Sequence, residues 1–594
     1  MRVAVAQFAT SLNTQENLTT CLSMIDNAAA CVPSIIVLPE FCNTQPCYTD
    51  HEQAWQQALA IESDFLQKIA QQAKKHACYI VLNVTLRRDL SRDKVDISIK
   101  SDISITSCLF SPDGELVQQV DKQKLTEQEN YFFISTKQAA SVVTHDFGKF
   151  GLMSGADSDN FQVPRALSLN GAQLICNSEN TFALDTSTLH DITHAVENNV
   201  FIATANKIGA LRPQHTCNKV TETTEQLLHV ENRQAIQQVY GTGQSQIITP
   251  EGKVLAKIEH NKAGYTFADI DLSPAGLIHK VRPDGTEFKQ QQCSAFNIAT
   301  ITADQPTITN HEYSDNVPET VNVAIFATYK SNEQAIEDVC HYIENNLSDI
   351  IQLPELFFIC DKTITHDQDE LKRIECLSHE LIQQISAVLR PFQYVCTSVV
   401  LNGNHQAVLI NQQGIIARQQ QLHFCQRYQW TELTDTINII SLPLEQGNIK
   451  LAMLTADDAN IADTVKMAAS HNIHLLLMPF DIQDSLEVNY SLLARAAENR
   501  VCMVAATREK SFAIQPSVEQ NQDKLKQNNK KVKSQKSTGL IINLSNNTTV
   551  LTQWQSGRFN GYINKPVVKH QHGKITKALI YPNASTDKSS IVFN

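Results

Sequence analysis

The sequence lacks the features that would place the chain in a membrane or on nucleic acid. No hydrophobic run approaches the ~18 residues that a transmembrane helix needs. The N-terminal segment has neither the apolar region nor the small-residue cleavage site of a signal peptide. The net charge of −13 over 594 residues disfavours a broad nucleic-acid surface, which is normally basic. We therefore expect no membrane span and no nucleic-acid partner.

Paired cysteines and cofactor motifs are also missing. The 15 cysteines include no Cys-x-x-Cys pair, and their odd number in a long chain argues against a disulfide framework. Gly241-Thr242-Gly243 lacks the third glycine of a dinucleotide-binding loop, and no phosphate-binding P-loop occurs. His570 and His572 are too sparse for a metal site. These absences predict a protein of the reducing cytoplasm that uses no cofactor and no metal.

The chain does contain an internal repeat. Segment 3–10, VAVAQFAT, returns at 321–328 as VNVAIFAT. Segment 38–41, LPEF, returns at 353–356 as LPEL, and segment 195–200, AVENNV, returns at 496–501 as AAENRV. Each copy has the size of a domain, whereas the repeats of solenoid proteins span only ~20–50 residues. The repeat therefore predicts two tandem domains.

Both halves alternate short β-branched runs with amphipathic helical stretches, a pattern that indicates an α/β fold with sheets of mixed direction. Residues 105–110 and 116–120 are predicted to form a hairpin around Asp113-Gly114. We place the domains at residues 1–292 and 321–577, with a tail and linker at 293–320 and a C-terminal tail at 578–594. Three segments are predicted to be insertions: 87–100, 213–237 and 517–537, the last of them expected to be disordered.

Three places in the first half carry chemical groups. Glu40 follows the apolar run 35–38, at the end of a predicted strand, where ligands of α/β sheets bind. Lys122 follows the hairpin, and Glu129 comes shortly after it. Segment 147–157 reads as a strand that ends in a sharp turn at Gly155 and Asp157, before a helix. Hydrolases expose a nucleophile at such a strand-to-helix elbow.

In this order and at these intervals, the three segments resemble the motifs of the nitrilase (carbon–nitrogen hydrolase) superfamily. The resemblance covers nearly all of both halves apart from the insertions. It implies that Glu40 is the catalytic glutamate and Lys122 the catalytic lysine. The family's second motif, Lys-x-His-Leu followed by an acidic residue, matches Lys122, Lys124, Leu125 and Glu129, with Lys124 in place of the histidine. The family places its cysteine nucleophile two residues before an aspartate, here Asp157.

That nucleophile position is Gly155, which has no side chain. In the family chemistry that the resemblance implies, a thiolate attacks a nitrile or amide carbon while the glutamate relays the proton and the lysine stabilises the tetrahedral species. Glycine adopts the strained elbow at the least cost but cannot attack. Loss of a nucleophile typically lowers the rate by several orders of magnitude.

The second copy has diverged further. Glu355 matches Glu40, and aligning Leu422 with Leu125 puts Gln419 at the position of Lys122. The offset of 301 residues that relates Asp157 to Asp458 (458 − 157) carries position 155 to Ala456. A slip of one or two residues would select Thr455 or Leu454, and neither is cysteine.

Other nucleophiles are the alternative. Ser154 or Thr455 would need an adjacent base to become reactive. Cys42 and Cys176 lie near the predicted pocket in sequence, although a buried cysteine is usually a small apolar core residue.

The resemblance implies two tandem nitrilase-like α-β-β-α sandwich domains that form a pseudo-dimer within one chain, and further oligomers remain open. The residues favour a catalytically impaired module that binds a small amide or carboxylate or has a regulatory role. The alternative is an active amide or nitrile hydrolase with an unconventional nucleophile.

Overall fold

The computed structural model places each part of the chain in a mixed α/β fold, as predicted. The described residues are 1–88, 102–135, 141–145, 147–159, 161–181, 186–211, 240–273, 275, 279–281, 287–289, 318, 320–326, 333–359, 364, 367–484, 486–499, 501–513, 534–542 and 576–579. They form two compact units, Met1–Ile278 and His279–Ser590. Within the described parts of the chain, no helix has both the length and the apolarity to cross a bilayer.

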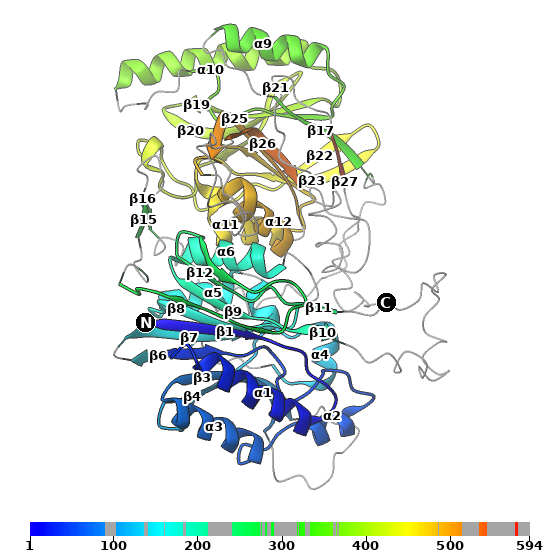
Figure 1. The fold of residues 1–594 in the computed structure, drawn as a ribbon. Helices are drawn as coiled ribbons and strands as arrows, with labels where there is room; N and C mark the ends of the chain where they lie inside the picture. The colour runs from blue at the N-terminus through cyan, green and yellow to red at the C-terminus, as the bar shows by residue number, and fades with distance from the viewer. Residues whose placement is uncertain are drawn as a thin grey trace, which may run out of the picture. The chain divides into compact units, whose positions relative to one another are not determined.

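The first unit contains two six-stranded sheets (Figure 1). One sheet has the order β14-β1-β2-β3-β4-β5 and the other β13-β12-β9-β8-β7-β6. The strands of the first sheet are β1 (Arg2–Gln7), β2 (Ile35–Val37), β3 (Tyr79–Arg87), β4 (Ile103–Phe110), β5 (Leu116–Asp121) and β14 (Gly264–Asp269). Those of the second are β6 (Val142–His145), β7 (Gly148–Ser154), β8 (Leu174–Ser178), β9 (Phe201–Ala205), β12 (Gln246–Ile248) and β13 (Val254–Lys257). A small pair, β10 (Ile208–Ala210) and β11 (Tyr240–Thr242), lies apart from these sheets.

The helices described in the first unit are α1 (Thr14–Ala29), α2 (His51–Gln57), α3 (Asp64–His76), α4 (Glu127–Phe132), α5 (Gln162–Leu169) and α6 (Thr186–Asn198). Helices α1 and α3 pack against one sheet, and α5 and α6 lie against the other (Figure 1). The Asn13 side chain caps α1 by accepting from the amides of Gln15 and Glu16. Gly114, with φ of +83°, makes the predicted turn between β4 and β5.

Strand β1 shows how the layers arise from the sequence. Its alternate residues Val3 and Val5 join the apolar core between the two sheets. Ala4 and Ala6 point to the opposite face and pack with α1 and α3. Because side chains alternate along a strand, one apolar segment can serve both layers. The first unit is therefore an α-β-β-α sandwich.

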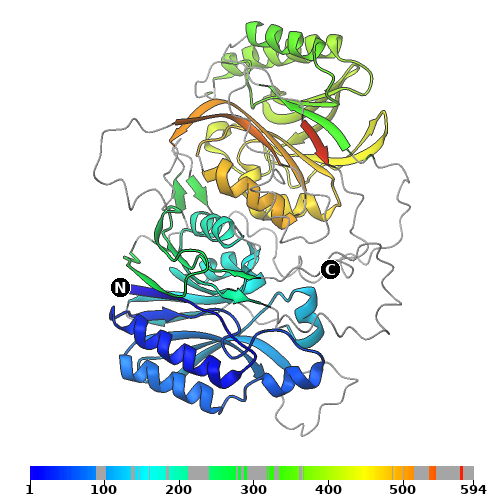
Figure 2. The same ribbon diagram turned by 45° about the vertical axis from the view of Figure 1, so that its right-hand side comes forward.

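The second unit has a corresponding strand order. One sheet runs β21-β20-β19-β18-β17-β27 and the other β22-β23-β24-β25-β26. The first comprises β17 (Thr320–Ile325), β18 (Ile350–Gln352), β19 (Tyr394–Leu401), β20 (Asn404–Asn411), β21 (Gly414–Gln420) and β27 (Thr576–Leu579). The second comprises β22 (Ile440–Leu444), β23 (Gly447–Met453), β24 (Leu475–Pro479), β25 (Cys502–Ala513) and β26 (Ser534–Ile542). Figure 2 shows β27 in red beside β17, its antiparallel partner.

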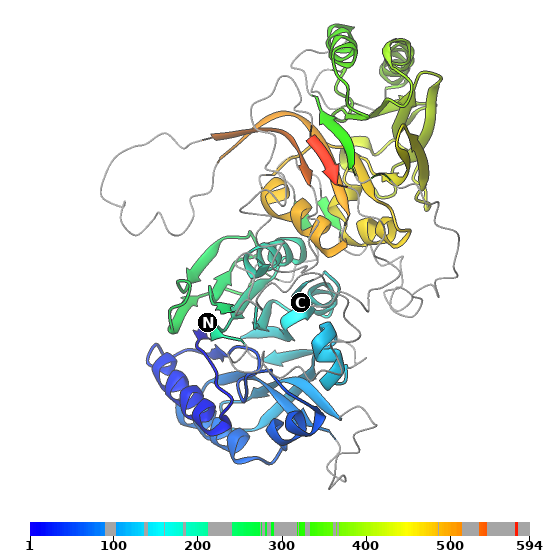
Figure 3. The same cartoon turned by 90° about the vertical axis from the view of Figure 1, so that its right-hand side faces the viewer.

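The helices of the second unit include α9 (Glu333–Glu344), α10 (Gln368–Val388), α11 (Ala462–Ser470) and α12 (Leu492–Asn499). Helices α9 and α10 pack side by side on one sheet (Figure 3). A separate apolar core lies between the two sheets. A short pair of strands, β15 (His279–Val281) and β16 (Glu287–Lys289), precedes these elements.

Three predicted boundaries need correction. Residues 517–537 were expected to be disordered, yet Ser534 to Ser537 belong to β26 and pair with β25. Backbone hydrogen bonds form this pairing, so it does not require the apolar composition on which strand prediction depends. Strand β27 continues to Leu579, beyond the predicted domain end at residue 577. The predicted insertion at 87–100 begins one residue too early, because Arg87 is the last residue of β3. Residues 89–100, the predicted insertion at 213–237 and most of the predicted linker lie outside the described residues.

Candidate functional site

Glu40 is the third residue after β2, beyond the carboxyl end of that strand, and is buried. The next residue, Phe41, has φ of +54°, so the chain turns sharply behind the glutamate. The Asn83 side chain accepts from the Phe41 amide at 3.0 Å, and the Glu179 carbonyl accepts from the Glu40 amide at 3.1 Å. Burial raises the pKa of Glu40 to about 7, although Lys122 opposes that rise.

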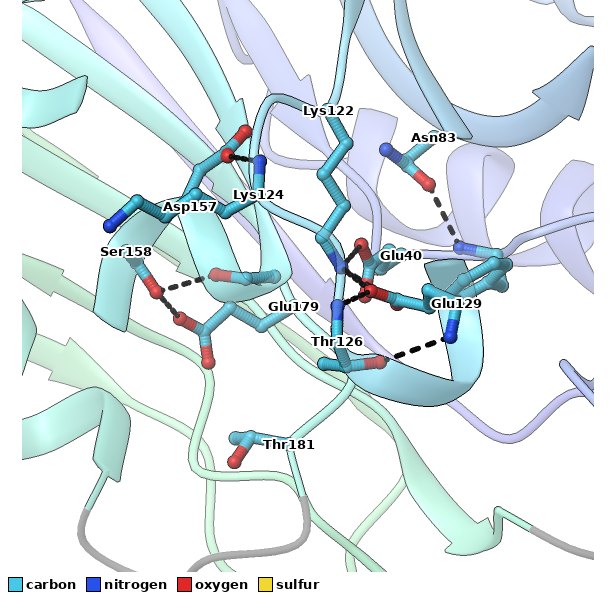
Figure 4. A network of polar contacts seen from close by, with 12 residues as sticks. Glu40, Asn83, Lys122, Lys124, Thr126, Glu129, Asp157, Ser158, Glu179 and Thr181 are labelled. Atoms are coloured by element: carbon cyan, nitrogen blue, oxygen red, sulfur yellow. Dashed lines mark hydrogen bonds and ion pairs between the residues drawn. The ribbon is translucent and has the colours of Figure 1, made fainter. Parts of the chain in front are cut away.

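Lys122 joins two carboxylates. It follows β5, and its ammonium donates to Glu40 Oε1 at 2.9 Å and to Glu129 Oε1 and Oε2 at 2.8 and 3.0 Å. Burial alone lowers the pKa of Lys122, but the charges of Glu129 and Glu40 outweigh that effect and raise it above its usual value. Figure 4 shows the lysine reaching between the two glutamates. The buried cluster thus contains one cation and two carboxylates.

Glu129 is held by the start of helix α4. Its Oε2 accepts from the Thr126 amide at 2.8 Å, and the Thr126 hydroxyl accepts from the Glu129 amide at 3.3 Å (Figure 4). This reciprocal pair is a capping box, which satisfies two amides at the helix terminus. The capping geometry fixes the carboxylate that faces Lys122.

Gly155 begins the turn after β7 with φ of +48°. A Cβ added there would lie 2.5 Å from Lys122 Nζ and 2.6 and 2.7 Å from the two Glu40 carboxylate oxygens. Position 155 therefore points at the acid–amine pair, as a nucleophile of the predicted chemistry would. The same distances are too short for a real Cβ, so the ends of the Lys122 and Glu40 side chains occupy the space that a side chain at 155 would need.

Asp157 ties this elbow to the lysine-bearing loop. One of its carboxylate oxygens accepts from the amides of Gln123 and Lys124 at 3.1 and 2.7 Å. Burial raises the pKa of Asp157 to about 6, while these amides and Lys122 oppose the rise. The carboxylate thereby connects the segment of Lys122 to the segment of Gly155.

Ser158, Glu179 and Asn177 form a buried hydrogen-bond network beside the turn at Gly155. Ser158 Oγ lies 2.8 Å from the Gly155 carbonyl and 2.6 Å from Glu179 Oε1 (Figure 4). Asn177 donates to the same Glu179 oxygen at 2.8 Å. Burial, together with the nearby Asp191, raises the pKa of Glu179 well above its usual value. No motif in the sequence singled out this support.

The alternative nucleophiles of the first unit form no hydrogen bond with Glu40 or Lys122 among the described residues. Cys42 Sγ donates to the Pro39 carbonyl and packs in the apolar layer beneath α1, and Cys176 lies in the core between the sheets. Among the described residues, no hydrogen bond connects either thiol, or the Ser154 hydroxyl, to Glu40 or Lys122. Burial raises the pKa of Cys176, which disfavours the reactive thiolate.

In the second unit, Glu355 occupies a closed polar cluster. It follows β18, and Leu356 after it has φ of +41°, matching the turn behind Glu40. The Ala456 amide donates to Glu355 Oε1 at 2.9 Å, and the Tyr428 hydroxyl donates to Oε2 at 2.9 Å. Ala456 has φ of +52°, which is unusual for a residue with a Cβ and matches the elbow at Gly155. Thr455 Oγ1 has no hydrogen-bond partner within the described parts of the chain.

Charged groups also surround Glu355. The Arg427 guanidinium lies 3.7 Å from Glu355 Oε2 and 3.1 Å from Asp457 Oδ1. Burial raises the pKa of Glu355 to about 7, while Arg427 opposes the rise. Neither Tyr428 nor Arg427 was predicted, because the family motif offers no equivalent for either side chain.

The lysine-equivalent position in the second unit is Gln421, and the prediction of Gln419 was wrong. Asp458 accepts from the amides of Leu422 and His423, as Asp157 accepts from the two residues directly after Lys122. Gln421 is the residue before that pair. Gln419 instead donates to the carbonyls of Gln420 and Thr436, away from Glu355.

The position of the leucine explains this correction. Leu125 lies three residues after Lys122 (125 − 122), whereas Leu422 lies one residue after Gln421 (422 − 421). The two leucines are therefore not equivalent, and aligning them placed the register two residues too early. The hydrogen bonds of Asp458 fix the register instead.

Comparisons with known proteins bear on the first unit. Residues 2–280 match the family model described as carbon-nitrogen hydrolase. The match supports the superfamily predicted from the motifs. None of the curated proteins compared with the chain matches it.

Solved structures also resemble part of the chain. One is a mutant of an amidase from Nesterenkonia AN1, described as a member of the nitrilase superfamily. It is 18% identical, covers 46% of this chain and 90% of its own, and has a TM-score of 0.36. Another is the NitN amidase from the same organism, 19% identical, with 46% and 92% covered and a TM-score of 0.35.

Proposed function

We propose that this chain is a nitrilase-superfamily protein that has lost hydrolysis and binds a small amide or carboxylate in its first unit. The observation that carries the proposal is Gly155, the position that points at Glu40 and Lys122 without any side chain. A base and a cation remain, but amide cleavage by the family chemistry also needs an attacking thiolate. The site keeps the groups that hold a polar ligand and lacks the one that would react with it.

The second unit is proposed to be a degenerate copy. Gln421 replaces the lysine, and Glu355 receives its hydrogen bonds from Ala456 and Tyr428 within the unit. Its proposed role is structural support for the first unit. The pairing of the two units as a pseudo-dimer, and a place in the cytoplasm, stay predictions.

Activity assays test the loss of hydrolysis. The full-length protein is incubated with a panel of aliphatic and aromatic amides and nitriles, and ammonia release is compared with that of Glu40→Gln. We expect both proteins to give the same background. Turnover by the natural chain that Glu40→Gln abolishes would instead establish an active hydrolase with another nucleophile.

Gly155→Cys is the converse test. The contacts that a Cβ would meet are the ends of two flexible side chains, which can recede, and Ala456 shows that the equivalent turn holds a Cβ. We expect this variant to gain ammonia release that the additional change Glu40→Gln removes. A folded Gly155→Cys protein without activity on any member of the panel would argue that more than the nucleophile has been lost.

Binding is tested separately by thermal shift with acetamide, propionamide and the corresponding carboxylates. A ligand at 100 times its Kd stabilises the folded state by about 2.7 kcal/mol. Lys122→Met should abolish the shift, whereas Lys68→Met, at a half-buried position of α3, should not. A shift that survives Lys122→Met would place the ligand elsewhere.

A further inference from the structure

The turn behind Glu40 is strained and requires support. Phe41 has φ of +54°, and a left-handed conformation costs a residue with a side chain about 1–2 kcal/mol. Asn83 accepts from the Phe41 amide, which fixes one side of the turn. The carbonyl side needs its own partner, because a buried carbonyl without a donor is costly.

Lys207 supplies that partner. It lies between β9 and β10, is 1% exposed, and donates from Nζ to the carbonyls of Phe41 at 3.0 Å and Thr44 at 3.2 Å. Its Nζ is also 5.6 Å from the centroid of the Phe41 ring, within cation–π range. Within the described residues, no salt bridge joins Lys207 to a carboxylate. Because the buried Lys207 ammonium donates both hydrogen bonds to carbonyls of this one turn, it stabilises the turn.

The second unit repeats the arrangement with a different cation. Arg508 donates to the carbonyls of Leu356 at 2.5 Å and Ile359 at 2.6 Å. Leu356 and Ile359 are the first and fourth residues after Glu355 (356 − 355 = 1, 359 − 355 = 4), as Phe41 and Thr44 are after Glu40 (41 − 40 = 1, 44 − 40 = 4).

The sequence separation between the cation and the aspartate of the elbow is also the same in both units. Lys207 follows Asp157 by 50 residues (207 − 157), and Arg508 follows Asp458 by 50 residues (508 − 458). Two units that share little sequence therefore place a cation on the same two carbonyls. The units differ at the lysine of the acid–amine pair, where one has Lys122 and the other Gln421.

We propose that Lys207 and Arg508 are positioning residues that clamp the left-handed turn after Glu40 and Glu355 and so aim each carboxylate at its elbow. Neither cation touches the reacting position itself. The exchange of lysine for arginine retains several N–H donors on a long side chain. The clamp is independent of the proposed loss of hydrolysis, because it concerns where the glutamate points.

The test compares Lys207→Met, which removes the donors, with Lys207→Arg, which copies the second unit. Crystal structures of both full-length variants report φ of Phe41 and the distance from Lys122 Nζ to Glu40 Oε1. We expect the methionine variant to lose the left-handed turn and the 2.9 Å contact, and the arginine variant to keep both. A methionine variant that retains both would overturn the proposal.

The pKa of the Glu40 carboxyl gives a second readout, which Lys207→Arg should restore. The carboxyl of Glu40 is followed by carbon-13 NMR, with its signal assigned by its loss in Glu40→Gln. The charge of Lys207 lowers the pKa of Glu40, although less than that of Lys122 does, so Lys207→Met should move the midpoint up and Lys207→Arg should return it. An unchanged midpoint in the methionine variant contradicts the clamp.

Arg508→Met and Arg508→Lys repeat the comparison in the second unit, read from φ of Leu356 and from the contact between the Ala456 amide and Glu355. They decide the question if Lys207→Met does not fold. None of these readouts depends on hydrolysis or on a ligand, so failure of the proposed function would leave them interpretable.

Discussion

Glu40 should make the first unit less stable as the pH rises toward neutrality. Its usual pKa is 4.5, and burial raises it to about 7 in the folded chain. Below pH 4.5 the carboxyl is protonated in both the folded and the unfolded state, so it costs nothing. Between pH 4.5 and about 7 the unfolded chain releases the proton while the folded chain keeps it, and stability falls. At 1.36 kcal/mol per pH unit, the loss attributable to Glu40 is about 3 kcal/mol.

Glu40→Gln removes this dependence because glutamine does not titrate. Relative to the natural chain, the variant should therefore gain about 3 kcal/mol of unfolding free energy between pH 4.5 and pH 7.5. The gain is a difference between two curves, so contributions of buried acids that do not interact with Glu40 or Lys122 cancel. Glu62→Gln, at an exposed position of the same unit, is the matched control and should leave the curve unchanged.

Urea unfolding followed by tryptophan fluorescence measures the effect. The chain has three tryptophans, and Trp55 belongs to the first unit. Replacing Trp430 and Trp554 by phenylalanine leaves Trp55 as a reporter of that unit alone. Parallel stability curves for the natural chain and Glu40→Gln over this pH range would refute the reasoning, since they would mean that Glu40 titrates alike in both states.

Two further predictions concern the turn at Gly155 and the cluster around Glu355. Gly155→Ala should destabilise the first unit by about 1–3 kcal/mol, because φ is +48° and the new Cβ meets Lys122. Ala456→Gly should change the stability of the second unit by less than about 1 kcal/mol. Equal losses of unfolding free energy at the two sites, measured in urea, would contradict this. Tyr428→Phe removes a donor from Glu355 and should cost the second unit about 1–3 kcal/mol at pH 8 and less at pH 5, where the carboxyl is protonated; a loss independent of pH would count against it.

The elbow was predictable from sequence because its residue types follow from its backbone. A sharp turn after a strand favours glycine, and the spacing from Gly155 to Asp157 then locates the family motif. The repeat extended the prediction to Ala456, since the elbows share an offset that Asp157 and Asp458 define. Strand 35–37 was predictable because burial on both faces requires an apolar residue at each of its positions.

Other residues of the site were not predictable because the sequence pattern does not show which loop residues are equivalent in the two units. Leu422 follows Gln421 directly, whereas Leu125 lies three residues after Lys122, so aligning the two leucines selected Gln419 in place of Gln421. Lys207 follows a strand and reads as an ordinary surface lysine. One signal was available: the 301-residue offset that relates Asp157 to Asp458 also relates Lys207 to Arg508 (508 − 207), two cations in otherwise dissimilar segments.

The two buried glutamates differ in the kind of group that holds their carboxylate oxygens. Glu355 receives a donor on each oxygen from groups that are fixed in its own unit, the Ala456 amide on one and the Tyr428 hydroxyl on the other. An incoming amide would have to displace one of them and leave it unpaired, which costs about 1–3 kcal/mol. Glu40 relies instead on Lys122, a flexible side chain with a second carboxylate to hold it. Lys122 already contacts Glu129, so it keeps one carboxylate partner if a ligand or a new side chain at position 155 separates it from Glu40, and we therefore predict binding for the first unit only.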